Sequence, residues 1–472
     1  MKKLSFFSIL LALAVMTFSL SSCDTNEVTK DDDTEQTDEK EKDKDGNEEE
    51  QKGHETDGGQ TEEENDSITD TWEAQNGMYC DGTLLYRITS SNKEVGVCGV
   101  VPSIWEIKDI PAKILIRNTV YSVTNIADEA FKGNTLLTTV TIPGHIQSIG
   151  SSAFEGSGLT SANIIEGMTS IGNRAFYGCR SLTSITIPAS VTSIGNAAFY
   201  GCSSLTSINI PAGVTSIGNY AFEYCSSLTS INIPASVTSI GGYAFSDCSS
   251  LTSITISEGV TSIGDGAFYN CASLTSITIP ASVTSIGYGA FYYCSSLASM
   301  SVTQGNPKYD SRGNCNAIIE TASNTLIAGC KATTIPASVT SIGYGAFEAC
   351  TSLTSITIPA GVTSIGNYAF EYCSSLASIS IPASVTSIGE YAFSKCTSLT
   401  SITIPASVTS IGGGAFYDCT SLTNVTNLSS TPQEIDYYTF STYGTLHVKP
   451  GCGSAYKKAS YWKQFSIVED AQ

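Results

Sequence analysis

The sequence predicts a β-dominated repeat solenoid, with one parallel strand in each 23-residue coil and β-rich caps at both ends. The first observation is the unit S-L-T-S-I-T-I-P-A-S-V-T-S-I-G-x-x-A-F-x-x-C-S, which recurs from about residue 131 to residue 426. A repeat of this length buries its apolar face only by stacking on its neighbours. The second observation is the phenylalanine column of this unit, which keeps the 23-residue step over most of the range: Phe131, Phe154, Phe176, Phe199, Phe222, Phe245, Phe268, Phe291, Phe347, Phe370, Phe393 and Phe416.

Each coil is expected to contain a strand, a turn, a short extended segment and a helical turn. In one coil, Ile208 and Ile210 alternate with Ser207 and Asn209, which is the period-two pattern of a strand with one buried face. The proline that follows ends the strand, because it cannot donate to a ladder of hydrogen bonds. The V-T-S-I-G segment then predicts the extended stretch, and A-F-x-x-C predicts the helical turn.

The L-x-x-I-x-I framing is a leucine-rich repeat pattern in compact form, α/β in type but dominated by strands. The full combination L-T-S-I-x-I-P-x-x-V-T-S-I-G-x-x-A-F-x-x-C resembles the BspA-like leucine-rich repeat family of bacterial surface proteins, over roughly residues 80–465. This resemblance implies an extracellular module for adhesion or protein interaction, with no cofactor and no enzymatic activity.

The N-terminus predicts secretion and lipid attachment. Lys2 and Lys3 precede an apolar run at residues 4–20, and L-S-S-C at residues 20–23 resembles the bacterial lipobox. Residues 1–22 are therefore predicted to be a lipoprotein signal peptide, with Cys23 as the lipidation site and this lipid as the only membrane contact. A transmembrane helix is the alternative, since a 17-residue apolar run lies at the short edge of what spans a bilayer.

Residues 23–70 are predicted to be an acidic disordered tether. Residues 24–70 hold 21 acidic and five basic side chains, out of a formal net charge of -21 for the chain, and almost no large apolar residue. Such a segment cannot offset the entropy of ordering by burial. An acidic tract after the lipidated cysteine resembles an export tag, whereas Asp24 resembles an inner-membrane retention signal in some bacteria. We expect anchoring to the outer membrane, facing the cell exterior.

The remaining chain divides into a solenoid between two caps. Caps are expected because an open end of the solenoid exposes apolar surface. The period breaks between Pro307 and Ile335, where two apolar runs around residues 321–324 predict a hairpin. The predicted boundaries are residues 71–125 for the N-terminal β cap, 126–426 for the solenoid with a hairpin insertion near 303–335, and 427–472 for the C-terminal cap.

The cysteines form columns and two possible bridges. Most recur at the repeat period, as buried thiols or as disulfides between neighbouring coils in an oxidising compartment. Cys315 and Cys330 are equidistant from the centre of the predicted hairpin, and Cys80 and Cys98 flank a second predicted hairpin in the N-terminal cap. Both pairs are possible disulfides. No metal site is expected, because no histidine or second cysteine lies at ligand spacing from the column cysteines.

Two surfaces are candidates for binding. The strand face presents uncharged polar columns that suit a glycan or an extended protein, or that simply form a solvated face: Ser184, Thr186, Ser207, Asn209, Ser230, Asn232, Ser253, Thr255, Ser276 and Thr278. Residues around A-F vary between coils and form a tyrosine ridge, which predicts either an interface or packing between turns: Tyr220, Tyr224, Tyr243, Tyr288, Tyr292, Tyr293, Tyr368, Tyr372 and Tyr391.

Catalysis and nucleic-acid binding find little support in the sequence. The three histidines, His54, His145 and His447, suggest no Ser-His-Asp or Cys-His constellation, and the folded part has no basic stripe. Carboxylates in the coils, such as Glu223 and Glu348, are expected at scattered surface positions. The sequence thus predicts a noncatalytic surface lipoprotein for adhesion, with extracellular proteins or glycans as partners and no nucleic acid; the alternatives are a carbohydrate-binding lipoprotein and a surface-layer spacer.

Overall fold

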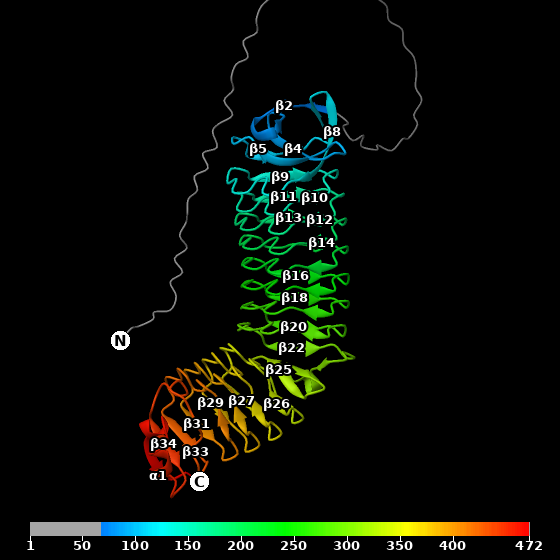
Figure 1. The fold of residues 1–472 in the computed structure, drawn as a ribbon. Helices are drawn as coiled ribbons and strands as arrows, with labels where there is room; N and C mark the ends of the chain where they lie inside the picture. The colour runs from blue at the N-terminus through cyan, green and yellow to red at the C-terminus, as the bar shows by residue number, and fades with distance from the viewer. Residues whose placement is uncertain (1–67, 472) are drawn as a thin grey trace, which may run out of the picture. The chain divides into compact units, whose positions relative to one another are not determined.

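The computed structural model describes residues 68–471, within one compact unit, Glu63–Gln472, that has its own core. The predicted signal peptide, Cys23 and nearly all of the predicted tether lie outside the described residues. The coils stack one upon another through this unit (Figure 1), so the predicted solenoid is confirmed.

Most coils contribute two faces of extended chain. The predicted strand at residues 207–210 is not formed as a strand, although Ile208 and Ile210 are buried and Ser207 and Asn209 are exposed as the alternation predicted. The first row of strands comes from the S-I-T-I segments: β9 (Thr139–Ile142), β11 (Ser161–Ile164), β13 (Ser184–Thr186), β16 (Ser230–Ile233), β18 (Ser253–Ile256), β20 (Ser276–Ile279), β22 (Ser299–Val302), β27 (Ser355–Thr357), β29 (Ser378–Ser380) and β31 (Ser401–Ile404). The second row comes from the T-S-I-G segments, where only an extended stretch was expected: β10 (Ser148–Ile149), β12 (Ser170–Ile171), β14 (Ser193–Ile194), β15 (Ser216–Ile217), β17 (Ser239–Ile240), β19 (Ser262–Ile263), β21 (Ser285–Ile286), β26 (Ser341–Ile342), β28 (Ser364–Ile365), β30 (Ser387–Ile388) and β32 (Ser410–Ile411).

The parallel register places equivalent residues of successive coils side by side. Ile194 pairs with Ile217, and Ile217 pairs with Ile240. The threonines of the consensus add a side-chain ladder: the Thr183 hydroxyl donates to the carbonyl of Thr160 at 3.0 Å, and equivalent bonds follow the second row. A 23-residue period therefore gives each polar group at these positions an identical partner one coil away.

The predicted helical turn is wrong. The A-F segment forms consecutive turns in which Ala197 and Gly201 have positive φ angles of 52° and 68°, so helical hydrogen bonding cannot continue. Alternate N–H groups of this corner bond to the next coil: the Phe176 N–H donates to the Ala198 carbonyl at 2.8 Å, and the Phe199 N–H to the Ala221 carbonyl at 2.8 Å. The N–H groups between them bond three residues back, as Tyr200 does to the Ala197 carbonyl at 3.1 Å. This corner is thus a third ladder between coils.

The core is a column of stacked phenylalanines. Ring centroids of successive phenylalanines lie 4.9 to 5.7 Å apart, nearly parallel, from Phe131 to Phe291 and again from Phe347 to Phe440. Column cysteines are buried thiols rather than disulfides; the Cys202 thiol, for example, donates to the Phe176 carbonyl at 3.2 Å. Burial raises the pKa of Cys202 well above its ordinary value, so it behaves as a small apolar group.

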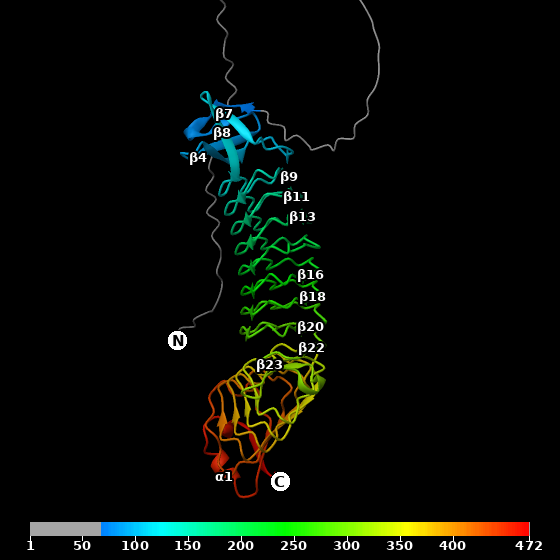
Figure 2. The same cartoon turned by 90° about the vertical axis from the view of Figure 1, so that its right-hand side faces the viewer.

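The N-terminal cap is an irregular set of strands that continues into the second row. Its order is β2-β3-β4-β5-β8-β10, and β8 carries the chain into the solenoid ladder (Figure 2). β1 pairs with β7, so strand structure begins at Ile68, ahead of the predicted boundary at residue 71. The elements are β1 (Ile68–Asp70), β2 (Trp72–Glu73), η1 (Gln75–Gly77), β3 (Tyr79–Cys80), β4 (Leu84–Ser90), β5 (Glu94–Val100), β6 (Glu106–Ile107), β7 (Lys113–Ile116) and β8 (Thr119–Ile126).

The C-terminal cap consists of degenerate coils that extend the first row. β31, β33, β34 and β35 pair in parallel, so the strand ladder continues past the predicted boundary at residue 427. Trp462 closes the phenylalanine column: its ring lies 5.5 Å from that of Phe440, and its Nε1–H donates to the Gln433 carbonyl at 2.8 Å. The elements are β33 (Asn424–Asn427), β34 (Thr445–Val448), α1 (Gly453–Tyr456), η3 (Trp462–Gln464) and β35 (Ser466–Glu469).

The period breaks at a hairpin that divides the core in two. β23 (Tyr309–Asp310), η2 (Arg312–Asn314), β24 (Ala317–Glu320) and β25 (Thr325–Gly329) lie between β22 and β26. On β24, Ile318 packs into the core of the preceding coils, whereas Ala317 and Ile319 pack into that of the following coils. Because successive side chains of a strand point to opposite sides, both faces of β24 are buried, one in each core.

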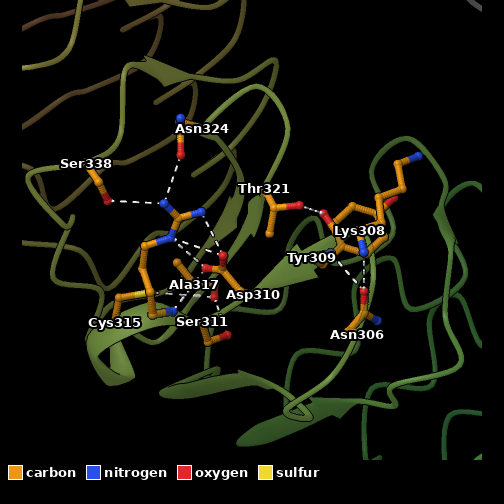
Figure 3. A network of polar contacts seen from close by, with 11 residues as sticks. Asn306, Lys308, Tyr309, Asp310, Ser311, Cys315, Ala317, Thr321, Asn324 and Ser338 are labelled. Atoms are coloured by element: carbon orange, nitrogen blue, oxygen red, sulfur yellow. Dashed lines mark hydrogen bonds and ion pairs between the residues drawn. The ribbon is translucent and has the colours of Figure 1, made fainter.

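Polar contacts fix this hairpin to the coils on both sides. The Asn306 amide donates to the carbonyls of Pro280 and Val283, at 2.9 and 2.8 Å, in the preceding coil. The guanidinium of Arg312 bonds to both oxygens of Asp310 within the insertion and donates to Ser338 Oγ of the following coil at 3.3 Å (Figure 3). The insertion is therefore a bonded part of the solenoid.

The possible Cys315–Cys330 disulfide does not form, because a β-bulge changes the register of the hairpin. Near the turn, Glu320 pairs with Thr325, which is the register that would place Cys315 opposite Cys330. Beyond the bulge, Ala317 pairs with Gly329, so the register has shifted by one residue. Cys330 thus lies beside Asn316, whose carbonyl accepts from its thiol at 3.4 Å. The two free thiols face different cores, as expected for a one-residue slip.

The possible Cys80–Cys98 disulfide does not form either. Cys80 lies on β3, opposite Leu85 of β4, while Cys98 is the bulged residue of β5 on the other side of β4. An intervening strand separates the two by about 9 Å, beyond the reach of a disulfide. The sequence revealed the β4–β5 hairpin but not the strand added before it.

Replacing Phe222 with alanine should lower the free energy of unfolding by about 3–5 kcal/mol, because the column would lose a ring packed on both sides. Urea denaturation of residues 63–472 measures this loss. Ser207→Ala, on the exposed strand face, is the control and should change stability by less than about 0.5 kcal/mol. Equal losses for both variants would contradict the column as the main source of stability.

Candidate functional site

The strand face carries all ten predicted polar residues on the surface. Each of the ten side chains is exposed, and Ser230 pairs with Ser253 and Asn232 with Thr255 in the parallel register. Within residues 68–471, only one of the ten makes a side-chain hydrogen bond: Thr278, whose hydroxyl lies 3.0 Å from Ser301 Oγ. The other nine leave their polar groups to solvent or to a ligand.

The tyrosine ridge is both packed and exposed. Tyr220 stacks on Tyr243 with ring centroids 5.5 Å apart, and Tyr368 stacks on Tyr391 at 5.4 Å. Three of the nine predicted ridge residues, including Tyr220, remain exposed, and the other six are half-buried. The same rings therefore pack against neighbouring turns and remain available as a contact surface.

The ridge continues across the hairpin insertion. The rings of Tyr288 and Tyr344 lie 4.9 Å apart, and Tyr344 in turn lies 5.1 Å from Tyr368. A second link joins Tyr293 to Tyr372 at 5.9 Å. Tyr344 was missed from the sequence, although it occupies the same place in I-G-Y-G-A-F as Tyr288.

Most ridge tyrosines lie at positions where the backbone favours glycine. Seven of the nine have positive φ, between 52° and 60°: Tyr220, Tyr224, Tyr243, Tyr293, Tyr368, Tyr372 and Tyr391. Glycine occupies the equivalent positions in other coils, as Gly201 does for Tyr224 and Gly266 for Tyr243. A bulky residue in this region costs on the order of 1–2 kcal/mol, so the side chain must compensate.

The expectation of scattered surface carboxylates is wrong for the position after the phenylalanine. Burial and Asp247 raise the pKa of Glu223 to about 7. Burial and the neighbouring Glu371 likewise raise the pKa of Glu348 to about 7. The charge of Glu223 acts on Tyr224 and that of Glu348 on Tyr292, so titratable carboxyl groups lie beside the tyrosine ridge.

A cavity opens where the hairpin interrupts the ridge. Its volume is about 310 Å³, and residues from the preceding coil, the hairpin and the following coil line it. Tyr288, Tyr292 and Tyr344 contribute aromatic groups, while Lys308 and Glu348 contribute charged ones. It forms where the column lacks stacking between Phe291 and Phe347, so it exists only because the period breaks.

Within residues 68–471, no helix is both long enough and apolar enough to cross a membrane. Among the same residues, no three His, Cys, Asp or Glu side chains are grouped to hold a metal ion.

The stacked coils with short parallel strands define a leucine-rich repeat solenoid. Residues 114–229, 215–322 and 323–447 match the family described as "BspA type Leucine rich repeat region (6 copies)". The chain therefore belongs to this family, which is one of leucine-rich repeat surface proteins, and the resemblance drawn from the sequence is confirmed.

Solved structures share the fold. A leucine rich cell surface protein from Faecalibacterium prausnitzii A2-165 is 30% identical with a TM-score of 0.56, over 74% of this chain and 94% of that chain. A leucine-rich repeat protein from Bacteroides ovatus ATCC 8483 is 28% identical with a TM-score of 0.57, over 82% of this chain and 98% of that chain. No curated protein matches the sequence.

The variant Glu348→Gln should be more stable than the parent protein at pH 8, by about 1–2 kcal/mol after allowing for solvent screening. The folded-state pKa of Glu348, about 7, lies above its ordinary value of 4.5. The stabilising effect of its proton is thus complete below pH 4.5 and is lost as pH rises through 7. The neutral amide avoids this loss, so the gain should vanish near pH 4.

Urea denaturation of residues 63–472 at pH 4, 6 and 8 measures the difference. Glu166→Gln is the control, because backbone N–H groups of Ala189 and Ser190 bond to Glu166 and lower the pKa of its carboxyl. That variant should gain nothing at pH 8. A gain for Glu348→Gln that does not vary with pH would contradict the assignment.

Proposed function

We propose that the protein is a noncatalytic adhesion lipoprotein that binds host matrix or other cell-surface proteins through its tyrosine ridge. The family of leucine-rich repeat surface proteins supports the surface setting. Tyrosine suits such a role because it combines a large apolar ring with a polar hydroxyl and has few rotatable bonds.

The backbone conformation of the ridge carries this proposal. Tyrosines occupy seven left-handed positions where glycine fits without strain and is present in other coils. Stacking between neighbouring rings offsets part of that cost, yet Tyr220 is 43% exposed and Tyr224 is 45% exposed. Exposed rings maintained at a conformational cost are what a contact surface requires.

Repetition supplies strength that a single coil lacks. The ridge runs through coils on both sides of the insertion, with rings in contact from Tyr288 through Tyr344 to Tyr368. Many weak contacts on one rigid support raise the apparent affinity for an extended or multivalent partner. An extended surface of this kind needs no deep pocket.

The anchor in the proposal is a lipid on Cys23, with residues 23–70 as the acidic tether and the outer membrane as the attachment site. The lipobox-like L-S-S-C and the apolar run before it support this part of the proposal. The tether would place the solenoid outside the cell, within reach of other surfaces.

A carbohydrate-binding lipoprotein is the second candidate. Nine of the ten strand-face side chains make no side-chain hydrogen bond within residues 68–471, so they are available to sugar hydroxyls. On this hypothesis the Ser/Thr/Asn face binds glycans and the ridge serves only for packing.

The triple variant Tyr220→Gly, Tyr224→Gly, Tyr243→Gly should weaken binding to matrix proteins at least about tenfold, because it removes three aromatic contacts. Glycine fits the left-handed backbone at these positions, so the fold should remain. Surface plasmon resonance of residues 63–472 over a panel of purified matrix proteins measures the change.

The matched control replaces Ser207, Asn209, Ser230 and Asn232 with alanine, and should leave protein binding unchanged. Loss of binding to a glycan array in this quadruple variant, with the glycine variant unaffected, would favour the carbohydrate-binding candidate. No saturable binding to either panel would contradict both the adhesion and the carbohydrate-binding candidates and would leave only a spacer role.

A protease that cannot cross the outer membrane should remove the solenoid from intact cells, because outward display exposes it. Immunoblotting of treated cells, with a periplasmic protein as the protected control, measures the loss. Complete protection of the solenoid in intact cells, with digestion after lysis, would place it in the periplasm and contradict adhesion.

A further inference from the structure

The cavity at the hairpin joins aromatic surface to a buried carboxylate. Glu348 contributes to its lining, and within the described residues its Oε2 is buried with no hydrogen-bond partner. Tyr292 lies beside Glu348: its hydroxyl is 3.5 Å from the Tyr344 carbonyl, and its hydrogen bonding lowers the pKa of Glu348 against the larger effect of burial. The Oε2 of Glu155 is likewise buried with no hydrogen-bond partner, so at this repeat position a nearby opposite charge is what stabilises the ionised carboxylate.

The same solenoid shows what completes such a site. Glu155 occupies the position after its phenylalanine, as Glu348 does. The guanidinium of Arg174, from the next coil, bonds to Glu155 Oε1 at 3.1 Å and lies 4.2 Å from the centroid of the Tyr177 ring. A carboxylate, a tyrosine ring and a basic side chain thus form one cluster at this position.

A second instance uses lysine. Glu371 again follows its phenylalanine, and Lys395 from the next coil places its ammonium 3.9 Å from the centroid of the Tyr372 ring. The positive charge of Lys395 also lowers the pKa of Glu371, against the effect of burial. Arginine and lysine therefore both fit beside a carboxylate at this repeat position.

Among residues 68–471, no basic side chain is placed beside Glu348 in this way. The next coil has Tyr368 where Arg174 lies in the first cluster, and Tyr372 where Lys395 lies in the second. Lys308 also lines the cavity, but its ammonium contacts residues of the hairpin: its Nζ lies 3.9 Å from Glu320 Oε1 and 5.3 Å from the centroid of the Tyr309 ring. The carboxylate and the rings are present, and the basic side chain is missing.

The local geometry keeps this space open. Gly345 has a φ of 57°, and a side chain there would collide with the Tyr292 hydroxyl. Tyr288, half exposed, lines the cavity, and its ring meets that of Tyr344 edge to face at 4.9 Å. A long side chain entering beside Tyr288 would meet ring surface first and the carboxylate of Glu348 further in.

We propose that this cavity binds a lysine or arginine side chain of a partner protein, with Glu348 as its counter-charge and Tyr288, Tyr292 and Tyr344 around its stem. The assignment rests on the proposed function and names the chemistry of its partner. Outside residues 24–70, which carry -16 of the formal net charge of -21, the chain is still net acidic, and this favours basic partners at long range.

Saturation-transfer NMR on residues 63–472 tests the proposal with two small probes, Nα-acetyl-lysine amide and Nα-acetyl-norleucine amide. The lysine probe should bind saturably and the uncharged norleucine probe should not. Glu348→Gln should weaken lysine binding at least tenfold, and Tyr288→Ala severalfold. Glu155→Gln is the matched control and should leave binding unchanged, because Arg174 already occupies that cluster.

Equal binding of norleucine would make the cavity a purely apolar site and overturn the proposal, as would unchanged lysine binding in Glu348→Gln. Absence of lysine binding in the parent protein would also overturn it, provided that denaturation shows the protein is folded. A protein that binds matrix proteins but not the lysine probe would overturn the cavity assignment alone. One that binds the probe but no matrix or cell-surface protein would overturn the proposed function instead.

Discussion

The structure depends on one constraint: each coil must present its backbone and side chains to an equivalent coil in the same register. Two strand rows, the A-F corner and the threonine hydroxyls all bond from coil to coil. The phenylalanine rings stack in the middle of these ladders, at 5.3 Å between Phe199 and Phe222. Because each element bonds mainly to its own copy, the residues that form these ladders stay nearly the same from coil to coil.

That constraint explains where a surface for binding can arise. The consensus leaves freedom on the outward side of the first strand row and around the phenylalanine. Outward strand residues stay small and polar, whereas tyrosines at the corners, such as Tyr243 and Tyr391, adopt a left-handed backbone. The second pattern costs conformational energy, and this is why the ridge supports a function better than the strand face does.

The hairpin shows what happens when register is lost. β24 closes the first core with Ile318 and opens the second with Ile319, so no apolar edge remains exposed. The interruption also separates Phe291 from Phe347, each of which stacks on the phenylalanine on its other side, and the cavity beside Glu348 lies at this break. A break in a repeat thus creates a region of the ridge where side chains from three different segments converge.

The sequence by itself determined the period, the strand with its exposed serine column, the buried phenylalanine and the family, because these repeat identically and need only local patterning. Tertiary structure decided features that depend on a single residue of register or on the next coil. The bulge before Ile319 separated Cys315 from Cys330, and a third strand separated Cys80 from Cys98. Burial of Glu348 was equally invisible, because its environment comes from Tyr292 and the hairpin, far away in sequence.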